Sequence, residues 1–509
     1  MPGVEEPIGC CSTLTPPLWG FGVPNVHEIP RSILYPMSSI ITDPFRQKLL
    51  LSAVALGVVM DGIDGSIVNV ALPTMATYFD TDTGTIAWVI ITYLLMMAGL
   101  LLVFGKLADR GFAKKLFLLG FVIFTLGSAA CGISPSLDIL LASRLVQGAG
   151  AAMIAAVAPL LCIRYLPPEM LGTSLGVIAA TSSIGFAAGP AIGGILTQHL
   201  SWHWIFLVNI PIGILGILFA ARVIPHDEPA DSTVSFDYPG AVTLFGAMMF
   251  ITFVLEEAAA RGITDPLILA GGTLFLLCAG LFIVRELTTP EPFLNIRIFS
   301  KWRFTAVLLA YLLVNVIFMG ILYLLPFYLT TEMNFDLATT GLYLLIPPAV
   351  IALISIPFGQ WSDRHGSRRV FAVAACSVLV FYSAIFAVLS PESGIVLLFA
   401  GLIFMGVAFG IAAGPASSRI IESAPEGGEG TGSSLMVTSI YFGGVLGTAI
   451  YAGLFTFATA GADGIVAFTD LDSARFLFGF HFTMAAGLVL SVVPLVLSAI
   501  VPDELKNTA

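Results

Sequence analysis

Long apolar stretches recur along this chain and are separated by short polar segments rich in glycine and proline. An α-helix of about 20 apolar residues is long enough to cross the hydrocarbon core of a bilayer. The pattern therefore predicts an all-α integral membrane protein with fourteen transmembrane helices. The predicted spans are residues 49–74, 86–104, 115–134, 139–162, 171–197, 203–224, 238–256, 266–285, 303–327, 339–361, 370–390, 393–416, 431–456 and 478–500.

The composition agrees with this interpretation and excludes several other classes of protein. The 509 residues are 57% hydrophobic and only 10% charged, whereas a soluble chain is about 25% charged. The sequence contains no basic patch that would indicate a nucleic-acid partner. The cysteines show no metal-ligand spacing and the histidines are scattered, so we expect no metal, no cofactor and no enzymatic chemistry. We predict a monomeric multi-pass protein of the cytoplasmic (inner) membrane.

Basic residues predict the orientation of the chain. Of the 21 Lys and Arg, only Arg144, Arg261 and Arg475 do not fall on one common side of the predicted spans, which leaves 18 on that side. Because Lys and Arg accumulate in cytoplasmic loops, we predict that both termini are cytoplasmic. Residues 1–46, rich in proline and glycine, are predicted to be a disordered extension, and residues 502–509 a short tail.

Two segments of the chain repeat one another. FGKLADRGFAKKLF (104–117) and FGQWSDRHGSRRVF (358–371) align without gaps, each at the cytoplasmic end of the second helix of a six-helix block. Repeated parallel halves are typical of transporters. We therefore predict two pseudo-symmetric six-helix bundles, at 47–225 and 303–501, joined by a linker at 226–302 that carries an inserted two-helix hairpin.

Three charged side chains fall well inside predicted spans. Asp61 and Asp64 lie three positions apart in the first span and share a helix face, while Arg144 lies in the fourth. At about 1.5 Å per residue the three reach similar depths, so an ion pair between the helices is geometrically allowed. Two close carboxylates do not both ionise easily, so with Arg144 they form a candidate proton-coupling site. The alternatives are a structural aspartate bonded to the backbone near Gly62 or Gly65, and an arginine that reaches the outer surface.

The two repeats resemble the loop motif of the major facilitator superfamily, G-x-L-A-D-R-x-G-R-K. In that family the loop forms a latch that breaks as the two halves rock. The first copy departs from the motif, because its glycine is Gly111, one position early, and Ala113 replaces the usual basic residue. Loop charges that only maintain topology are the alternative. The implied latch residues are Gly105, Asp109, Arg110, Gly359, Asp363 and Arg364.

Further strings resemble the branch of 14-helix drug:proton antiporters within that superfamily. LLASRLVQGAGAA resembles its fourth-helix motif, and DGSIVNVALPTM and WHWIFLVNIPIG resemble signatures of the branch, although His203 departs from the usual arginine. GFAAGPAIGG resembles the antiporter motif of the fifth helix, which in the family separates proton-exchanging exporters from importers. Glycines at every fourth position allow close helix packing, and a proline bends the helix. The implied motif residues are Gly185, Gly189, Pro190, Gly193 and Gly194.

Aromatic and amide side chains are the candidates for the wall of a substrate cavity. The last six predicted spans carry no Asp or Glu well inside them. Aromatic walls suit flat lipophilic substrates, including cations. Packing between helices is the alternative role for each residue. The candidates are Asn69, Gln147, Tyr311, Asn315, Phe318, Tyr343 and Tyr441.

The resemblance implies a proton-coupled antiporter that exports lipophilic small molecules or drugs by alternating access. Its partners would be the small-molecule substrate, protons and the lipid bilayer. One alternative is a dedicated transporter of a single metabolite, siderophore or lipid, because motifs identify the scaffold better than the cargo. A membrane enzyme and a non-transporting receptor or scaffold are further alternatives.

Overall fold

The computed structural model describes residues 40–227, 237–289, 292, 294–365, 368–424, 429–460 and 465–502. Within these residues the chain is helical without a β-strand, and fourteen helical segments are long and apolar enough to cross a membrane. Each of them overlaps one predicted span, so the prediction of fourteen spans is confirmed. Most of the predicted N-terminal extension and nearly all of the C-terminal tail lie outside the described residues.

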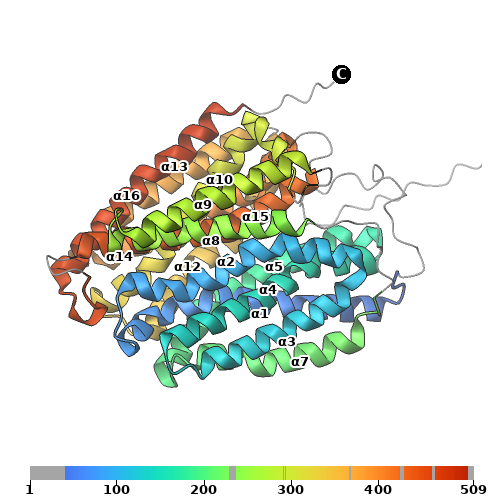
Figure 1. The fold of residues 1–509 in the computed structure, drawn as a ribbon, viewed down its shortest axis with the longest axis horizontal. Helices are drawn as coiled ribbons and strands as arrows, with labels where there is room; N and C mark the ends of the chain where they lie inside the picture. The colour runs from blue at the N-terminus through green and yellow to red at the C-terminus, as the bar shows by residue number, and fades with distance from the viewer. Residues whose placement is uncertain are drawn as a thin grey trace, which may run out of the picture.

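The first half of the chain forms one bundle, shown in blue to green in Figure 1. Its first helix begins at Pro44, earlier than the predicted boundary at residue 47. The sixth span is interrupted at Val208 and so consists of two helices. The helices are α1 (Pro44–Tyr78), α2 (Thr83–Leu107), α3 (Ala113–Gly132), α4 (Leu137–Tyr165), α5 (Leu171–His199), α6 (Trp204–Leu207) and α7 (Asn209–Val223).

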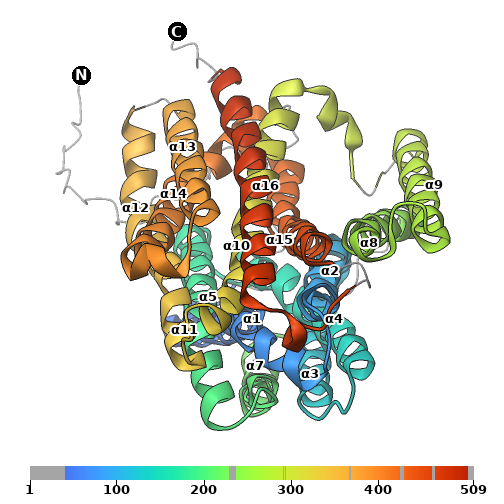
Figure 2. The same cartoon turned by 90° about the vertical axis from the view of Figure 1, so that its left-hand side faces the viewer.

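The second half forms another bundle, and an inserted hairpin lies beside both. The hairpin helices α8 (Tyr238–Arg261) and α9 (Pro266–Thr288) stand at one side of the molecule, where α8 packs against α2 and α15 (Figure 2). The helices of the second bundle are α10 (Trp302–Thr331), α11 (Leu337–Leu344) continued by α12 (Ile346–His365), α13 (Arg368–Ala387), α14 (Gly394–Ser423), α15 (Glu429–Thr459) and α16 (Ser473–Ile500).

Aspartates define the start of several of these helices. A side-chain carboxylate at the N-cap accepts hydrogen bonds from backbone N–H groups that have no partner inside the helix. Asp82, for example, accepts from Gly84 N at 2.8 Å and from Thr85 N at 3.0 Å at the start of α2. The other capping aspartates are Asp43, Asp237, Asp265, Asp336 and Asp472.

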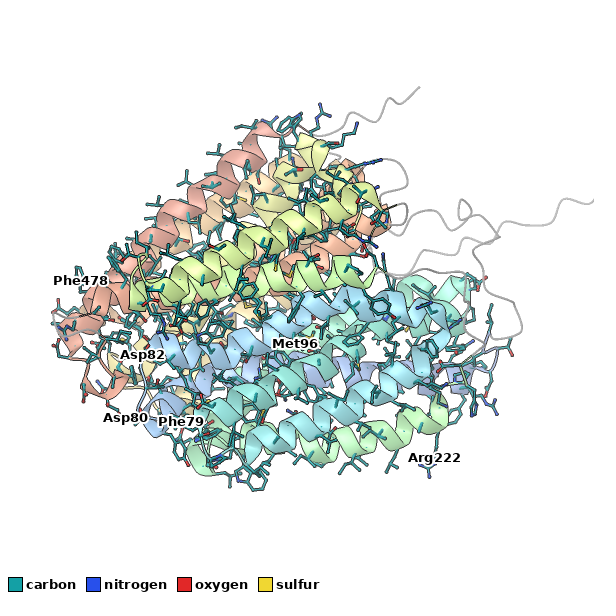
Figure 3. All side chains as sticks on the ribbon, viewed as in Figure 1. Phe79, Asp80, Asp82, Met96, Arg222 and Phe478 are labelled. Atoms are coloured by element: carbon teal, nitrogen blue, oxygen red, sulfur yellow. The ribbon has the colours of Figure 1, made fainter. Side chains whose placement is uncertain are left out.

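The two ends of the first bundle differ in charge. Asp80 and Asp82 lie at one end of the molecule and Arg222 lies at the other (Figure 3). The acidic end is the one predicted to face outward, because cytoplasmic loops are enriched in Lys and Arg.

The two bundles are in contact at the predicted outer end. The backbone N–H of Ala338 on α11 donates to Gln198 Oε1 on α5 at 2.8 Å. Near the same end Tyr323 OH on α10 donates to the carbonyl oxygen of Thr83 on α2, and Phe468 N donates to Thr81 O at 3.2 Å. These bonds, here called the outer contact, hold the bundles together at the end of α5 and at the start of α2.

Candidate functional site

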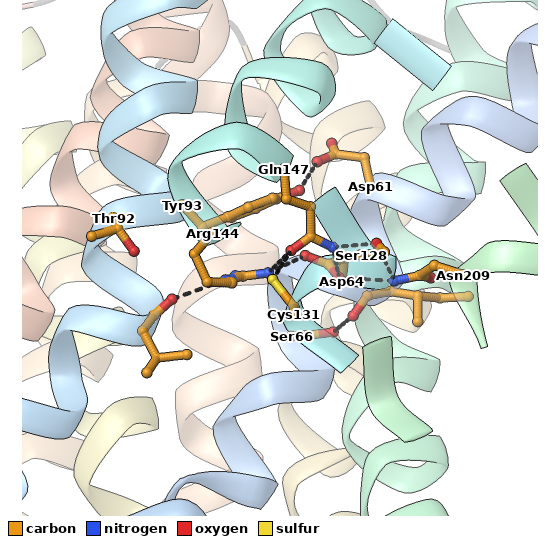
Figure 4. A network of polar contacts seen from close by, with 12 residues as sticks. Asp61, Asp64, Ser66, Thr92, Tyr93, Ser128, Cys131, Arg144, Gln147 and Asn209 are labelled. Carbon is orange, nitrogen blue, oxygen red and sulfur yellow. Dashed lines mark hydrogen bonds and ion pairs between the residues drawn. The ribbon is translucent and has the colours of Figure 1, made fainter. Parts of the chain in front are cut away.

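Asp64 lies at the centre of a buried polar network in the first bundle (Figure 4). Its side chain is completely buried on α1, and Arg144 on α4 is 1% exposed. Arg144 Nη1 lies 2.6 Å from Asp64 Oδ2. Gln147 Nε2 on α4 and Asn209 Nδ2 on α7 donate to Asp64 Oδ1 at 2.8 and 3.0 Å. The carboxylate therefore has an ion-pair partner and two amide donors, as a buried charge requires.

The guanidinium of Arg144 is held by contacts in several directions. Its Nε donates to the carbonyl oxygen of Val89 at 3.0 Å, and its Nη1 also donates to Gln147 Oε1 at 2.6 Å. Its centre lies 4.2 Å from the ring centroid of Tyr93 on α2. The interpretation of Arg144 as a residue that reaches the outer surface is therefore not supported. A planar guanidinium is suited to bonding and stacking at once, and an ammonium group is not.

Two further residues, Ser128 and Cys131, contact Gln147. Gln147 Nε2 donates to Ser128 Oγ on α3 at 2.6 Å, and the Cys131 thiol donates to Gln147 Oε1 at 3.6 Å. Cys131 thus contacts the network in addition to packing in the bundle. Sequence reasoning did not identify Ser128, Asn209 or Tyr93 as site residues. Asn209 did carry a signal, since it is a lone amide in an apolar span, inside the string WHWIFLVNIPIG.

Asp61 occupies a different environment from Asp64, although one turn of helix separates them. Tyr93 OH donates to Asp61 Oδ1 at 2.6 Å. Asp61 lines a cavity of about 290 Å³ between the two bundles. Tyr93 therefore links the two aspartates, because its hydroxyl binds Asp61 while its ring lies against Arg144.

The walls of this central cavity are mainly apolar and aromatic. Asn315, Phe318 and Tyr441, three of the residues proposed from the sequence, line it together with Asp61. Phe186 on α5 and Phe409 on α14 complete the aromatic wall and were not proposed from the sequence. The rings of Phe318 and Phe409 are 4.2 Å apart between centroids. The cavity thus combines one carboxyl group with several aromatic rings.

The other proposed cavity residues lie elsewhere. Asn69 Nδ2 donates to the carbonyl oxygen of Ser66 at 3.4 Å, and Gln147 belongs to the Asp64 network. Tyr311 lines a smaller pocket within the second bundle, beside Arg419. The ring of Tyr343 packs against Phe335, with centroids 5.2 Å apart.

The glycines of the fifth-helix string bring α5 close to α1. A Cβ atom on Gly185 would lie 2.6 Å from the carbonyl oxygen of Val59, and a Cβ on Gly193 would lie 2.5 Å from that of Ile67. A Cβ on Gly189 would lie 2.9 Å from the carbonyl oxygen of Ile63. Only glycine allows this separation of the two helices. These contacts place α5 directly on the helix that carries Asp61 and Asp64.

The same string also contacts the second bundle. A Cβ on Gly194 would clash with the carbonyl oxygen of Leu337 on α11. Across the same interface, a Cβ on Gly341 of α11 would clash with the carbonyl oxygen of Pro190. Helix α5 therefore packs on α1 through one set of residues and on α11 through another.

The loop repeats are described only in part. The side chains of Asp109 and Asp363 lie outside the described part of the structure, so the predicted latch contacts are not described. Gly105 and Gly359 have open space beside them, and Arg364 is exposed at the end of α12. Residues Ala108–Phe112, which include Arg110, form a π-helical turn in which Gly111 has φ of 104°. A residue with a side chain is strained at that φ, which explains the early glycine.

Comparisons with known proteins agree with this fold. The family model described as Major Facilitator Superfamily matches residues 54–448. A riboflavin transporter of Clostridioides difficile (strain 630) is 31% identical over 411 residues, which cover 80% of this chain and 88% of that protein. A multidrug resistance protein B homolog of Mycobacterium tuberculosis (strain ATCC 25618 / H37Rv) is 29% identical over 409 residues, which cover 79% of this chain and 75% of that protein. The crystal structure of a peptide transporter aligns with a TM-score of 0.66 at 14% identity, and the alignment covers 91% of this chain and 97% of that protein.

The family model spans most of the chain, including both loop repeats and the residues of the Asp64 network. The structural alignment extends over both bundles and supports the same fold. This chain belongs to the Major Facilitator Superfamily and is a membrane transporter, not an enzyme.

Proposed function

We propose that the protein exports lipophilic small molecules across the cytoplasmic membrane in exchange for protons. The observation that carries this proposal is the position of Asp61, whose carboxyl group lines the central cavity while Tyr93 connects it to the buried Asp64–Arg144 pair. A carboxyl group in a cavity wall can hold either a proton or an interaction with a cationic substrate. The sealed pair beside it can respond to either event.

The proposed cycle uses both aspartates. Protonation of Asp61 from the outer side favours the arrangement described here, with the outer contact formed, and Tyr93 transmits the change to the Asp64–Arg144 pair. A substrate that enters the cavity beside Asp61 from the cytoplasm or inner leaflet favours loss of the proton and the return step. The driving force is about 1.4 kcal/mol per pH unit and about 2.3 kcal/mol per charge for each 100 mV.

The cavity wall supports a flat, apolar or cationic substrate. Phe318, Phe409 and Tyr441 present aromatic rings, which stabilise lipophilic cations through their π-faces. The volume of about 290 Å³ lies near the lower end of the range for small-molecule sites. The multidrug resistance relative supports export as the direction of transport.

A dedicated transporter of one compound is the second candidate function. It is favoured by the riboflavin transporter among the relatives, which is 31% identical to this chain. The two candidate functions differ in the range of substrates accepted. A site with aromatic walls binds many flat molecules, whereas a dedicated site rejects analogues that leave its polar groups unpaired.

Asp61→Asn is expected to abolish substrate-dependent proton release, because the amide keeps the shape of the side chain but cannot exchange a proton. The measurement is proton release from energised everted vesicles on addition of lipophilic cationic dyes. Asp138→Asn, at the exposed start of α4, is the matched control and is expected to behave like the native protein. Native-like release from Asp61→Asn would exclude Asp61 as the exchanging group. Release by riboflavin alone among a panel of compounds would instead favour the dedicated transporter.

A further inference from the structure

The inserted hairpin contains a buried carboxyl group that has no part in the central cavity. Glu256 on α8 is 4% exposed, although the hairpin lies at the side of the molecule. Trp88 Nε1 on α2 donates to Glu256 Oε2 at 2.7 Å. This contact joins the hairpin to the first bundle near the predicted outer end.

Oxygen atoms from three parts of the chain converge beside Glu256. A Cβ atom on Gly84, in the first turn of α2, would lie 3.0 Å from Glu256 Oε1, 3.0 Å from Asp82 Oδ1 and 2.8 Å from Thr456 Oγ1. Thr456 is on α15 and 3% exposed. Among the described residues its hydroxyl oxygen has no hydrogen-bond partner. This hydroxyl oxygen can therefore accept a hydrogen bond from a donor beside it.

This cluster lies on the seam between the two bundles. Gly84 and Trp88 belong to α2 of the first bundle, whereas Thr456 belongs to α15 of the second. Tyr323 on α10 donates to the carbonyl oxygen of Thr83 directly beside the cluster, as part of the outer contact. Opening of the outer end would therefore separate Gly84 from Thr456 and admit water to Glu256.

The charged groups around Glu256 are mainly acidic. Asp82 faces it from the start of α2, where its carboxylate already accepts bonds from Gly84 N and Thr85 N. On α8 itself Glu257 is the neighbouring carboxylate, and Arg261 Nε lies 2.6 Å from Glu257 Oε2. The Arg261 guanidinium therefore pairs with Glu257, and the neutral N–H of Trp88 is the donor that contacts Glu256. From the remaining elements Tyr323 and Thr456 contribute neutral hydroxyl groups.

We propose that Glu256 is a second proton-binding site, and that its protonation favours formation of the outer contact. Closing the seam around an ionised Glu256 removes a charge from water beside Asp82, and this is costly. Closing the seam around the neutral acid avoids that cost, and the acid O–H is a donor of the kind that Thr456 Oγ1 lacks. Proton binding and closure therefore stabilise each other, as linkage requires. The proton comes from the outer aqueous phase and returns to it on opening.

This site is independent of Asp61 and of the identity of the substrate, so it can be tested without transport. The readout is hydrogen exchange of the backbone in peptides at the outer contact, corrected for the intrinsic effect of pH on exchange. The measurement uses the full chain in an Asp61→Asn background, which removes the carboxyl group of the central cavity and keeps the Asp64–Arg144 pair. One linked proton changes the closing equilibrium by up to about tenfold per pH unit.

With Glu256 intact, protection of these peptides is expected to rise as the pH falls, by up to that factor. Glu256→Gln is expected to remove the pH dependence and to keep protection high, because the amide mimics the neutral acid. Asp138→Asn, at the exposed start of α4, is the control and is expected to retain the pH dependence. Glu256→Asp is expected to restore it.

Infrared difference spectra provide a second readout. A carboxylic acid band that changes with pH is expected with Glu256 present and is expected to be missing in Glu256→Gln. If Glu256→Gln does not insert, Glu256→Met removes the carboxyl group without adding polar atoms. Unchanged pH dependence in Glu256→Gln or Glu256→Met, or equal loss in Asp138→Asn, would overturn the proposal. If the pH dependence is present and is lost in Glu256→Gln, but lipophilic dyes release no protons from vesicles, only the proposed antiport is contradicted.

Discussion

Asp64→Ala is expected to destabilise the protein by about 3–5 kcal/mol, because it leaves the buried Arg144 guanidinium without its anionic partner. Arg144 is 1% exposed, so water does not replace the lost carboxylate. Gln147 and Asn209 would also each lose an acceptor on Asp64. Removing one member of such a pair costs more than the pair itself contributes, since the remaining charge stays buried.

The double variant Asp64→Ala, Arg144→Ala is expected to be less destabilised than the sum of the two single variants. The difference measures the coupling between the two side chains directly. Free energies of unfolding in detergent, from denaturant titration, provide the measurement. Asp138→Ala, at the exposed outer end of α4, is the control and is expected to change stability by less than about 0.5 kcal/mol. Additive single effects would contradict the buried ion pair.

Gly193→Ala is expected to abolish transport and to lower the free energy of unfolding by about 1–3 kcal/mol through overpacking. Its new Cβ would lie 2.5 Å from the carbonyl oxygen of Ile67. A backbone atom cannot rotate away as a side chain can, so α5 and α1 must separate. Because α1 carries Asp64, this separation would also pull the carboxylate away from Arg144 on α4.

The matched control is Gly176→Ala on the same helix. Nothing lies within 4 Å of the position that its Cβ would occupy. Alanine is favoured over glycine by up to about 1 kcal/mol in a helix interior, so this variant is expected to be neutral or stabilised. Thermal unfolding and vesicle transport of the two variants provide the comparison. Equal effects of both substitutions would show that helix propensity, and not the α1–α5 contact, decides the outcome.

The sequence was sufficient for the number and position of the spans, because an apolar stretch of the required length has few alternatives to crossing the bilayer. It also indicated that Asp64 and Arg144 could meet, because rise per residue places both at similar depth. That depth argument gives only the coordinate along the helix axis. It does not say which face of the helix a residue occupies once the bundle is packed.

The rotation of each helix, and hence the environment of each polar residue, was decided by the tertiary structure. Asp61 and Asp64 are one turn apart, yet one lines the cavity and the other is sealed against α4 and α7. Gln147, proposed for the cavity, instead supports Asp64.

Glu256 ends a predicted span, and the packing of α8 on α2 and α15 places it at a buried seam. The sequence by itself therefore determined which segments cross the membrane and which charges need partners. Only the tertiary structure decided which residues those partners are, because the rotation of each packed helix depends on neighbours that are distant in sequence.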